Sequence, residues 1–215
     1  MQTRTMTMNP YQNNKGKDQP DPFCRRKFFQ KSLLSAAGIA LLPVSGFSSI
    51  LKASVPGKSK EEIFNQLDEL VDKYFPIFGT CSQTSFYALN EVFDLKSENI
   101  VKALAPFPGI AARGETCGSV TGSLLAIALI YEDNDIFNEK KKLSMNPSVA
   151  FCTQFENEFC STRCRNVIEH VSKKKYDITK PEDYKKPEED GAFEHCPYVI
   201  KQAVHYAAEL ILEKS

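Results

Sequence analysis

Apolar residues recur every three or four positions along most of the chain beyond residue 58, which is the spacing of one face of an α-helix. Ser59 and Glu62 have the spacing of a capping box, and Pro76 and Gly79 are typical of the end of the helix that this box begins. Further helices are predicted over residues 81–93, 97–104 and 116–131. The last of these is apolar nearly all round, as expected for a helix at the centre of a bundle.

The second half of the chain continues the helical pattern. Residues 148–170 are predicted to form one amphipathic helix, and the residues from Pro197 onward are predicted to form another. Between them, residues 173–191 are highly charged and contain Pro181 and Pro187, which favours an exposed connection. No segment shows the sustained alternation of apolar and polar residues that indicates a β-strand. The sequence therefore predicts an all-α fold, a single compact bundle of five or six helices.

The first 53 residues have the composition of an export signal rather than that of a folded domain. Arg25 and Arg26 precede an apolar stretch over residues 33–47, and their context resembles the twin-arginine export motif. This stretch is too short and too interrupted for a comfortable membrane span. We therefore expect a disordered N-terminus and signal peptide in residues 1–53, a linker in residues 54–58 and a helical domain in residues 59–215.

A twin-arginine signal would place the mature domain outside the cytoplasm, in the periplasm. If the signal is not cleaved, it would anchor the domain to the membrane, and this would be its only membrane contact. A chance succession of basic and apolar residues is the alternative without export. The twin-arginine route carries proteins that have already folded, often with a metal cofactor inserted beforehand, so the signal favours a protein that contains a cofactor.

The distribution of charge excludes one large class of functions. Residues 1–53 carry eight Lys or Arg and two Asp or Glu, which leaves 19 basic and 25 acidic residues in the remainder and a net charge of −6 there. A surface that neutralises phosphates needs the opposite sign, so we expect no nucleic-acid partner. The chain also lacks a Gly-rich phosphate-binding loop after a strand-like segment, which argues against nucleotide chemistry.

The cysteines are the most informative residues of the mature domain. One of the seven cysteines lies in the leader, and the other six are Cys81, Cys117, Cys152, Cys160, Cys164 and Cys196. Three of these six, Cys81, Cys117 and Cys196, stand at the start of predicted helices. Free N–H groups and the helix dipole stabilise an anion there, and the thiolate is the reactive and metal-binding form of cysteine. This placement predicts a site that holds several thiolates together.

Cys160 and Cys164 are both expected inside the helix predicted over residues 148–170. They would lie one turn apart on nearly the same helix face, so they could bind one metal together. A disulfide between them is disfavoured, because their side chains would be parallel. Gly118 and Gly122 are also four residues apart on one helix face, where each weakens a helix by about 1 kcal/mol relative to alanine. Two interpretations of this glycine pair remain open, which are close approach of a cofactor and tight packing against another helix.

The order and context of the cysteines resemble those of the C_GCAxxG_C_C family of redox-active proteins, over about residues 62–212. Cys81 matches the first cysteine of the family, and the segment Cys117-Gly118-Ser119-Val120-Thr121-Gly122 matches its central motif in the form Cys-Gly-Ala-x-x-Gly. Cys164 and Cys196 match the third and fourth cysteines. Ser119 replaces the alanine of the motif, and Cys160 stands where glycine is expected. The resemblance implies redox activity, and it suggests an exported oxidoreductase as the partner protein.

Four chemical roles are open for the cysteines. The first is electron transfer through an iron–sulfur centre held by Cys81, Cys117, Cys164 and Cys196, since four thiolates are the usual complement of such a cluster. The second is thiol–disulfide chemistry without a metal, which suits an oxidising compartment. Three static disulfides that stabilise a binding or structural domain are the third role, and a structural zinc site is the fourth. The chain has no Cys-x-x-Cys pair, so any shared site must be assembled from distant segments.

Overall fold

The computed structural model describes residues 57–132, 143–177 and 185–214 of the chain. The described residues are helical and include no β-strand; Thr116 and Arg163 form one isolated antiparallel bridge. The six longer helices are α2 (Lys60–Phe78), α3 (Cys81–Phe93), α6 (Gly118–Tyr131), α7 (Met145–Phe159), α8 (Cys164–Ser172) and α10 (Cys196–Lys214). The shorter ones are α4 (Glu98–Ala103), α5 (Gly109–Ala112), α9 (Lys186–Glu189) and the 3-10 helix η2 (Ala192–His195). The predicted all-α fold is confirmed.

The first helix forms as its sequence predicts. The Ser59 side chain accepts a hydrogen bond from the Glu62 N–H, and the Glu62 carboxylate accepts one from the Ser59 N–H, so the capping box is present. Helix α2 ends at Gly79, whose φ of 65° is the left-handed conformation that glycine adopts most readily. Pro76 lies within the last turn rather than ending the helix. The chain then turns directly into α3, which places Cys81 beside the end of α2.

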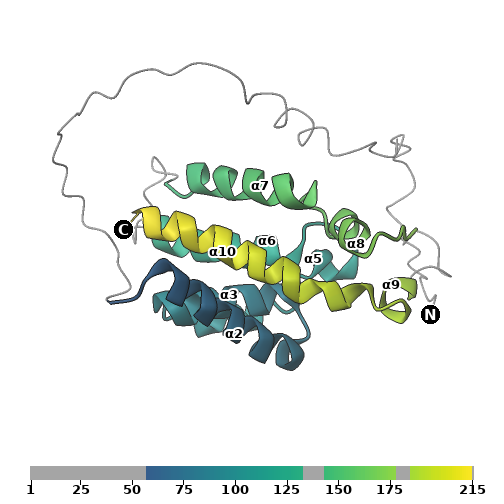
Figure 1. Ribbon diagram of the computed structural model, residues 1–215, viewed down its shortest axis with the longest axis horizontal. Helices are drawn as coiled ribbons and strands as arrows, with labels where there is room; N and C mark the ends of the chain where they lie inside the picture. The colour runs from purple at the N-terminus through teal and green to yellow at the C-terminus, as the bar shows by residue number, and fades with distance from the viewer. Residues whose placement is uncertain (1–56, 133–142, 178–184, 215) are drawn as a thin grey trace, which may run out of the picture. The chain divides into compact units, whose positions relative to one another are not determined.

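Helix α10 lies against most of the other long helices. It packs against α2, α3, α6 and α7, and Figure 1 shows it between α7 on one side and α2 with α3 on the other. The most extensive helix pair is α3 with α6. Between these helices lies one large core, whose bulkiest fully buried side chains are Phe86, Phe151, Phe155, Phe159, Ile63, Leu67, Leu89, Leu104, Ile127, Ile200 and Ile211. The predicted central position of α6 is correct except along the stripe of Leu125 and Leu129, which are 36% and 44% exposed.

The single helix predicted over residues 148–170 is wrong. The structure has two helices there, because Cys160 adopts a left-handed conformation with φ of 64° and ends α7. Its N–H donates to the Glu156 carbonyl, and the chain runs extended before α8 begins at Cys164. No glycine or proline marks this break in the sequence. Cys164 is therefore at the start of a helix and not in the middle of one. Cys160 and Cys164 do not lie one turn apart on a common helix.

The exposed connection predicted over residues 173–191 is only partly correct. Tyr176 is 9% exposed and Pro187 is buried, although their neighbours in sequence are charged and exposed. Tyr176 and Ala192 pack with Ile168 of α8 in a second, smaller apolar cluster beside Cys164 and Cys196. The connection therefore supplies a wall to the region where these cysteines lie.

The predicted twin-arginine signal and most of the linker predicted over residues 54–58 lie outside the described residues. Among the helices that the structure describes, none has both the length and the apolar character needed to cross a membrane.

Candidate functional site

Four cysteines from four separate segments converge in the folded domain. Cys81, Cys164 and Cys196 are the first residues of α3, α8 and α10, and Cys117 is the N-cap of α6. The sulfur atoms lie close enough that charges on the other three cysteines raise the pKa of Cys81. Cys81, Cys117, Cys152, Cys164 and Cys196 are free thiols. The structure thus brings together the four cysteines that the sequence proposed as a site, each of them at a helix start.

A short stretch of backbone pairing joins Cys117 to Cys164. The N–H of Cys117 donates to the Thr162 carbonyl at 2.8 Å, and the N–H of Cys164 donates in return to the Glu115 carbonyl. The pairing is antiparallel, and the Arg163–Glu115 ion pair at 3.5 Å lies on its exposed side. The extended residues after the break at Cys160 are therefore what positions the third cysteine against the second.

Gly118 allows Cys81 to reach the site. A Cβ atom at Gly118 would lie 2.4 Å from Cys81 Sγ and 2.8 Å from the Ser82 nitrogen, so only glycine leaves room for the start of α3. A Cβ atom at Gly122 would lie 2.1 Å from Ser85 Oγ and 2.5 Å from the Ser82 carbonyl oxygen. Both glycines face α3. Of the two interpretations, close approach of a cofactor and tight packing against another helix, this supports the second. Their predicted role in cofactor binding stays a prediction.

The hydrogen bonds at Cys117 favour its thiolate. Its pKa is lowered to about 7, first by the hydrogen bond from the Cys81 thiol and in addition by the backbone N–H groups of Ser119 and Val120, which together outweigh the effect of burial. The same hydrogen bond raises the pKa of Cys81, which is also raised by burial. Cys117 is therefore the thiol that ionises first near neutral pH.

The other two thiols of the site hold their protons more tightly. Burial raises the pKa of Cys164 to about 12, and the neighbouring Cys117 charge adds to this shift. Burial followed by the charges of Cys117 and Cys164 raises the pKa of Cys196 well above its ordinary value. The expectation that helix starts lower the pKa of several thiols thus agrees with Cys117 alone, because burial and mutual repulsion outweigh the helix dipole at the others.

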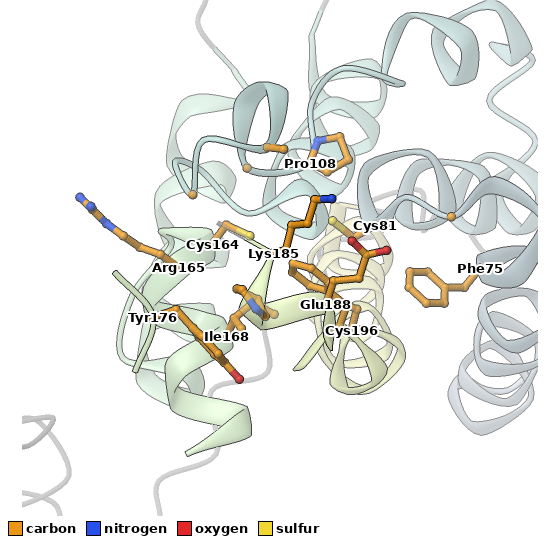
Figure 2. Close-up of a pocket in the computed structure, with 16 residues that line it drawn as sticks. Phe75, Cys81, Pro108, Cys164, Arg165, Ile168, Tyr176, Lys185, Glu188 and Cys196 are labelled. Atoms are coloured by element: carbon orange, nitrogen blue, oxygen red, sulfur yellow. The ribbon is translucent and has the colours of Figure 1, made fainter. Parts of the chain in front are cut away.

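A cavity of about 420 Å³ opens beside the sulfur atoms. Cys81, Cys164 and Cys196 line it, while Cys117 is only 4% exposed and does not line it. Figure 2 shows the cavity with these three thiols and with Lys185 and Glu188 around it. Its apolar walls are formed by Phe75, Pro108, Ala112, Ile168, Tyr176, Pro187 and Phe193. Three of these, Tyr176, Pro187 and Phe193, lie in or next to the charged connection. Isolated aromatic and proline residues among charged neighbours are the sequence feature that could have indicated them.

A left-handed turn forms another part of the wall. Gly109, Ile110, Ala111 and Ala112 have φ values of 55°, 51°, 55° and 60°, so three successive residues with side chains adopt a conformation that favours glycine. For each of these three residues, the left-handed conformation costs roughly 1–2 kcal/mol relative to the right-handed one. Such strain is concentrated at functional sites. Pro106 and Pro108 predicted a loop here, but the handedness of the turn was not predicted.

Two further cysteines stand apart from the cavity. Cys152 is half-buried on α7, where burial raises its pKa, and Cys160 is the C-cap of α7. Neither lines the cavity. The φ of 64° at Cys160 explains why glycine is expected at this position, since glycine adopts that conformation without steric cost.

The four cysteines suit a single metal ion and an iron–sulfur cluster to different degrees. Within the described part of the chain, no group of three or more His, Cys, Asp or Glu side chains is arranged so that it could hold a metal ion. The donor set itself is one that iron–sulfur clusters use, since four thiols meet beside an apolar cavity with helix N–H groups behind them. The donor atoms are therefore of the kind that such a cluster uses.

Comparison with known proteins agrees with the resemblance found in the sequence. The family model described as "Putative redox-active protein (C_GCAxxG_C_C)" matches residues 79–210. This stretch contains all four cysteines of the site. No curated protein and no solved structure matches the chain.

Proposed function

The chain belongs to the C_GCAxxG_C_C family of redox-active proteins, and on this basis we propose that it transfers electrons through an iron–sulfur cluster held by Cys81, Cys117, Cys164 and Cys196. The observation that carries the proposal is the meeting of four thiols from four distant segments beside one apolar cavity. Static disulfides need only pairs of thiols, whereas a cluster needs four. The bound cluster would supply one-electron transfer.

The electrostatics of the four thiols support a metal-containing state. The pKa of Cys117 is about 7, whereas the pKa of the other three thiols is raised, at Cys81 first by its hydrogen bond to Cys117 and at Cys164 and Cys196 first by burial. A coordinated metal removes the proton from a thiol outright and neutralises the resulting charge. The N–H groups at the helix starts would then stabilise the sulfur anions, as helix N-termini do. Cys81, Cys117, Cys164 and Cys196 would hold the cluster, whose positive charge would offset the repulsion among their thiolates.

A second function is favoured by the contact between Cys81 and Cys117. These two thiols share a hydrogen bond, and the pKa of Cys117 is about 7, so a thiolate already faces a neighbouring thiol. Oxidation would join the two sulfur atoms and release two protons and two electrons to an external disulfide, which becomes a dithiol. The exposed fractions of 8% and 4% for these residues hinder such an exchange partner, which is why this function stands second.

We also propose that the protein acts outside the cytoplasm. The support is the pair Arg25-Arg26 before an apolar stretch, which resembles a twin-arginine signal. This route exports folded proteins, so a cluster inserted in the cytoplasm would travel with the domain. An exported oxidoreductase is the partner that fits this location.

The test is to purify the full chain without oxygen and to measure iron, acid-labile sulfide and the visible absorption spectrum. We expect iron and sulfide together with broad visible absorbance, which Cys117→Ser and Cys164→Ser abolish. Cys152→Ser is the matched control and should leave the spectrum unchanged, because Cys152 does not line the cavity. A colourless protein that loses two thiols on oxidation, but not in Cys117→Ser, would favour the disulfide instead. Absence of both iron and reversible thiol oxidation would refute both functions.

A further inference from the structure

The cavity beside the cysteines extends well beyond the sulfur atoms. Its volume of about 420 Å³ lies within the range of roughly 300–1,000 Å³ that is typical of sites for small organic molecules. Cys81, Cys164 and Cys196 occupy one part of its lining, and the rest includes residues from α2, α8, α9 and η2 and from the turn around α5. A centre bound by the sulfur atoms would therefore leave room for a second molecule next to it.

The lining of this remaining space is mainly apolar and partly aromatic. Phe75 and Phe193 contribute rings, and Ile168 contributes an aliphatic surface. Tyr176 presents its ring, since its hydroxyl donates to an Asp190 carboxylate oxygen at 3.4 Å. Phe193 is 44% exposed, which is a high value for an aromatic residue that lines a cavity. The site thus matches a flat, apolar ring that stacks against aromatic side chains.

Few charged groups face this space. Lys185 and Glu188 line the cavity, and Figure 2 shows the Lys185 side chain extending over it while the Arg165 guanidinium points away. One ammonium group can donate a hydrogen bond to a carbonyl oxygen of a ligand. A nucleotide or another polyphosphate would need several cations, and the domain carries an excess of acidic residues.

We propose that the cavity binds a quinone or its quinol, which acts as the small-molecule redox partner of the cysteine centre. This inference rests on the proposed iron–sulfur function. A quinol that loses two electrons and two protons becomes a quinone. A one-electron centre held by the cysteines would take one electron per protein molecule, so one quinol would reduce two protein molecules, and the two protons would pass to water at the cavity mouth. The ring lies against Phe193 and Ile168, and a carbonyl oxygen accepts a hydrogen bond from Lys185.

Duroquinone is the appropriate probe, because all its ring positions carry methyl groups and thiols cannot add to it. Its binding to the purified full chain is measured by isothermal titration calorimetry. We expect saturable binding that Phe193→Ala weakens about tenfold, because the exposed ring is a cavity wall and not a core residue. The matched control is Leu129→Ala, which truncates a side chain of equal 44% exposure that does not line the cavity, and it should bind like the unmodified protein.

In the second part of the experiment, durohydroquinone is added to the oxidised protein without oxygen. Bleaching of the visible absorbance is the expected result. Lack of saturable binding, or equal binding by Phe193→Ala, would overturn the inference. Binding without reduction of the centre would overturn the assignment of the quinol as redox partner. A colourless, iron-free protein that binds duroquinone and discriminates Phe193→Ala would support the cavity assignment and refute the iron–sulfur function alone.

Discussion

Replacement of Gly122 by alanine tests whether the glycines of the central motif serve helix packing. The new Cβ atom would lie 2.1 Å from Ser85 Oγ, 2.5 Å from the Ser82 carbonyl oxygen and 3.0 Å from the Phe86 nitrogen. Two of these three atoms belong to the backbone of α3, so rotation of a side chain cannot relieve the overlap. Helices α3 and α6 would have to move apart along their most extensive contact.

The expected magnitude follows from two opposing effects. Alanine improves helix propensity over glycine by about 1 kcal/mol. Overpacking of a close contact typically costs about 1–3 kcal/mol, and an overlap with two backbone atoms lies at the upper end of this range. Gly122→Ala should therefore lower the free energy of unfolding by about 2 kcal/mol. For a domain of this size the melting temperature should fall by roughly 4–8 °C.

The assay is thermal and urea denaturation followed by circular dichroism, with Thr121→Ala as the control for helix propensity on the same helix. Ser85→Ala removes only the contact to the hydroxyl, so the double variant Ser85→Ala/Gly122→Ala should recover part of the loss and not all of it. A Gly122→Ala protein that is as stable as the unmodified chain, or more stable, would refute the packing argument and return the glycine to a role in ligand binding.

Three other predictions concern the thiols. In iron-free protein, the alkylation rate of Cys117 should rise as pH passes about 7, whereas that of Cys196 should begin to rise only at a higher pH, which mass spectrometry of labelled peptides can measure. The same pH dependence for both cysteines would contradict the hydrogen-bond argument. The pKa values of Cys81, Cys164 and Cys196 are raised on folding, so the folded protein holds protons that the unfolded chain releases above about pH 9. The free energy of unfolding should therefore fall as pH rises above about 9, and less steeply in Cys164→Ser. A free energy of unfolding that does not change with pH in this range would refute the argument. Cys160→Gly should raise the free energy of unfolding by about 1 kcal/mol, because it removes a left-handed side-chain residue, and should leave the redox centre intact; a less stable variant would contradict this.

The positions of most helices were predictable because their signals are local. The capping box at Ser59 and Glu62, the glycine at the end of α2 and the apolar spacing of α3, α6 and α10 depend on neighbouring residues only. The break after α7 has no such signal, because Cys160 is forced into a left-handed conformation without a glycine. Its cause is the pairing of residues 162–165 with residues 114–117, which are about 50 positions away in the chain.

The sequence by itself determined that the domain is helical, that four cysteines recur in the order of a redox-active family, and that three of them stand at helix starts. Only the tertiary structure decided that Cys164 also begins a helix, that Gly118 makes room for Cys81, and that Cys117 alone ionises near neutral pH. The physical reason is range. Helix formation and capping act over a few residues, whereas the pKa of a thiol and the space around it depend on burial and charges contributed by segments that meet only after folding.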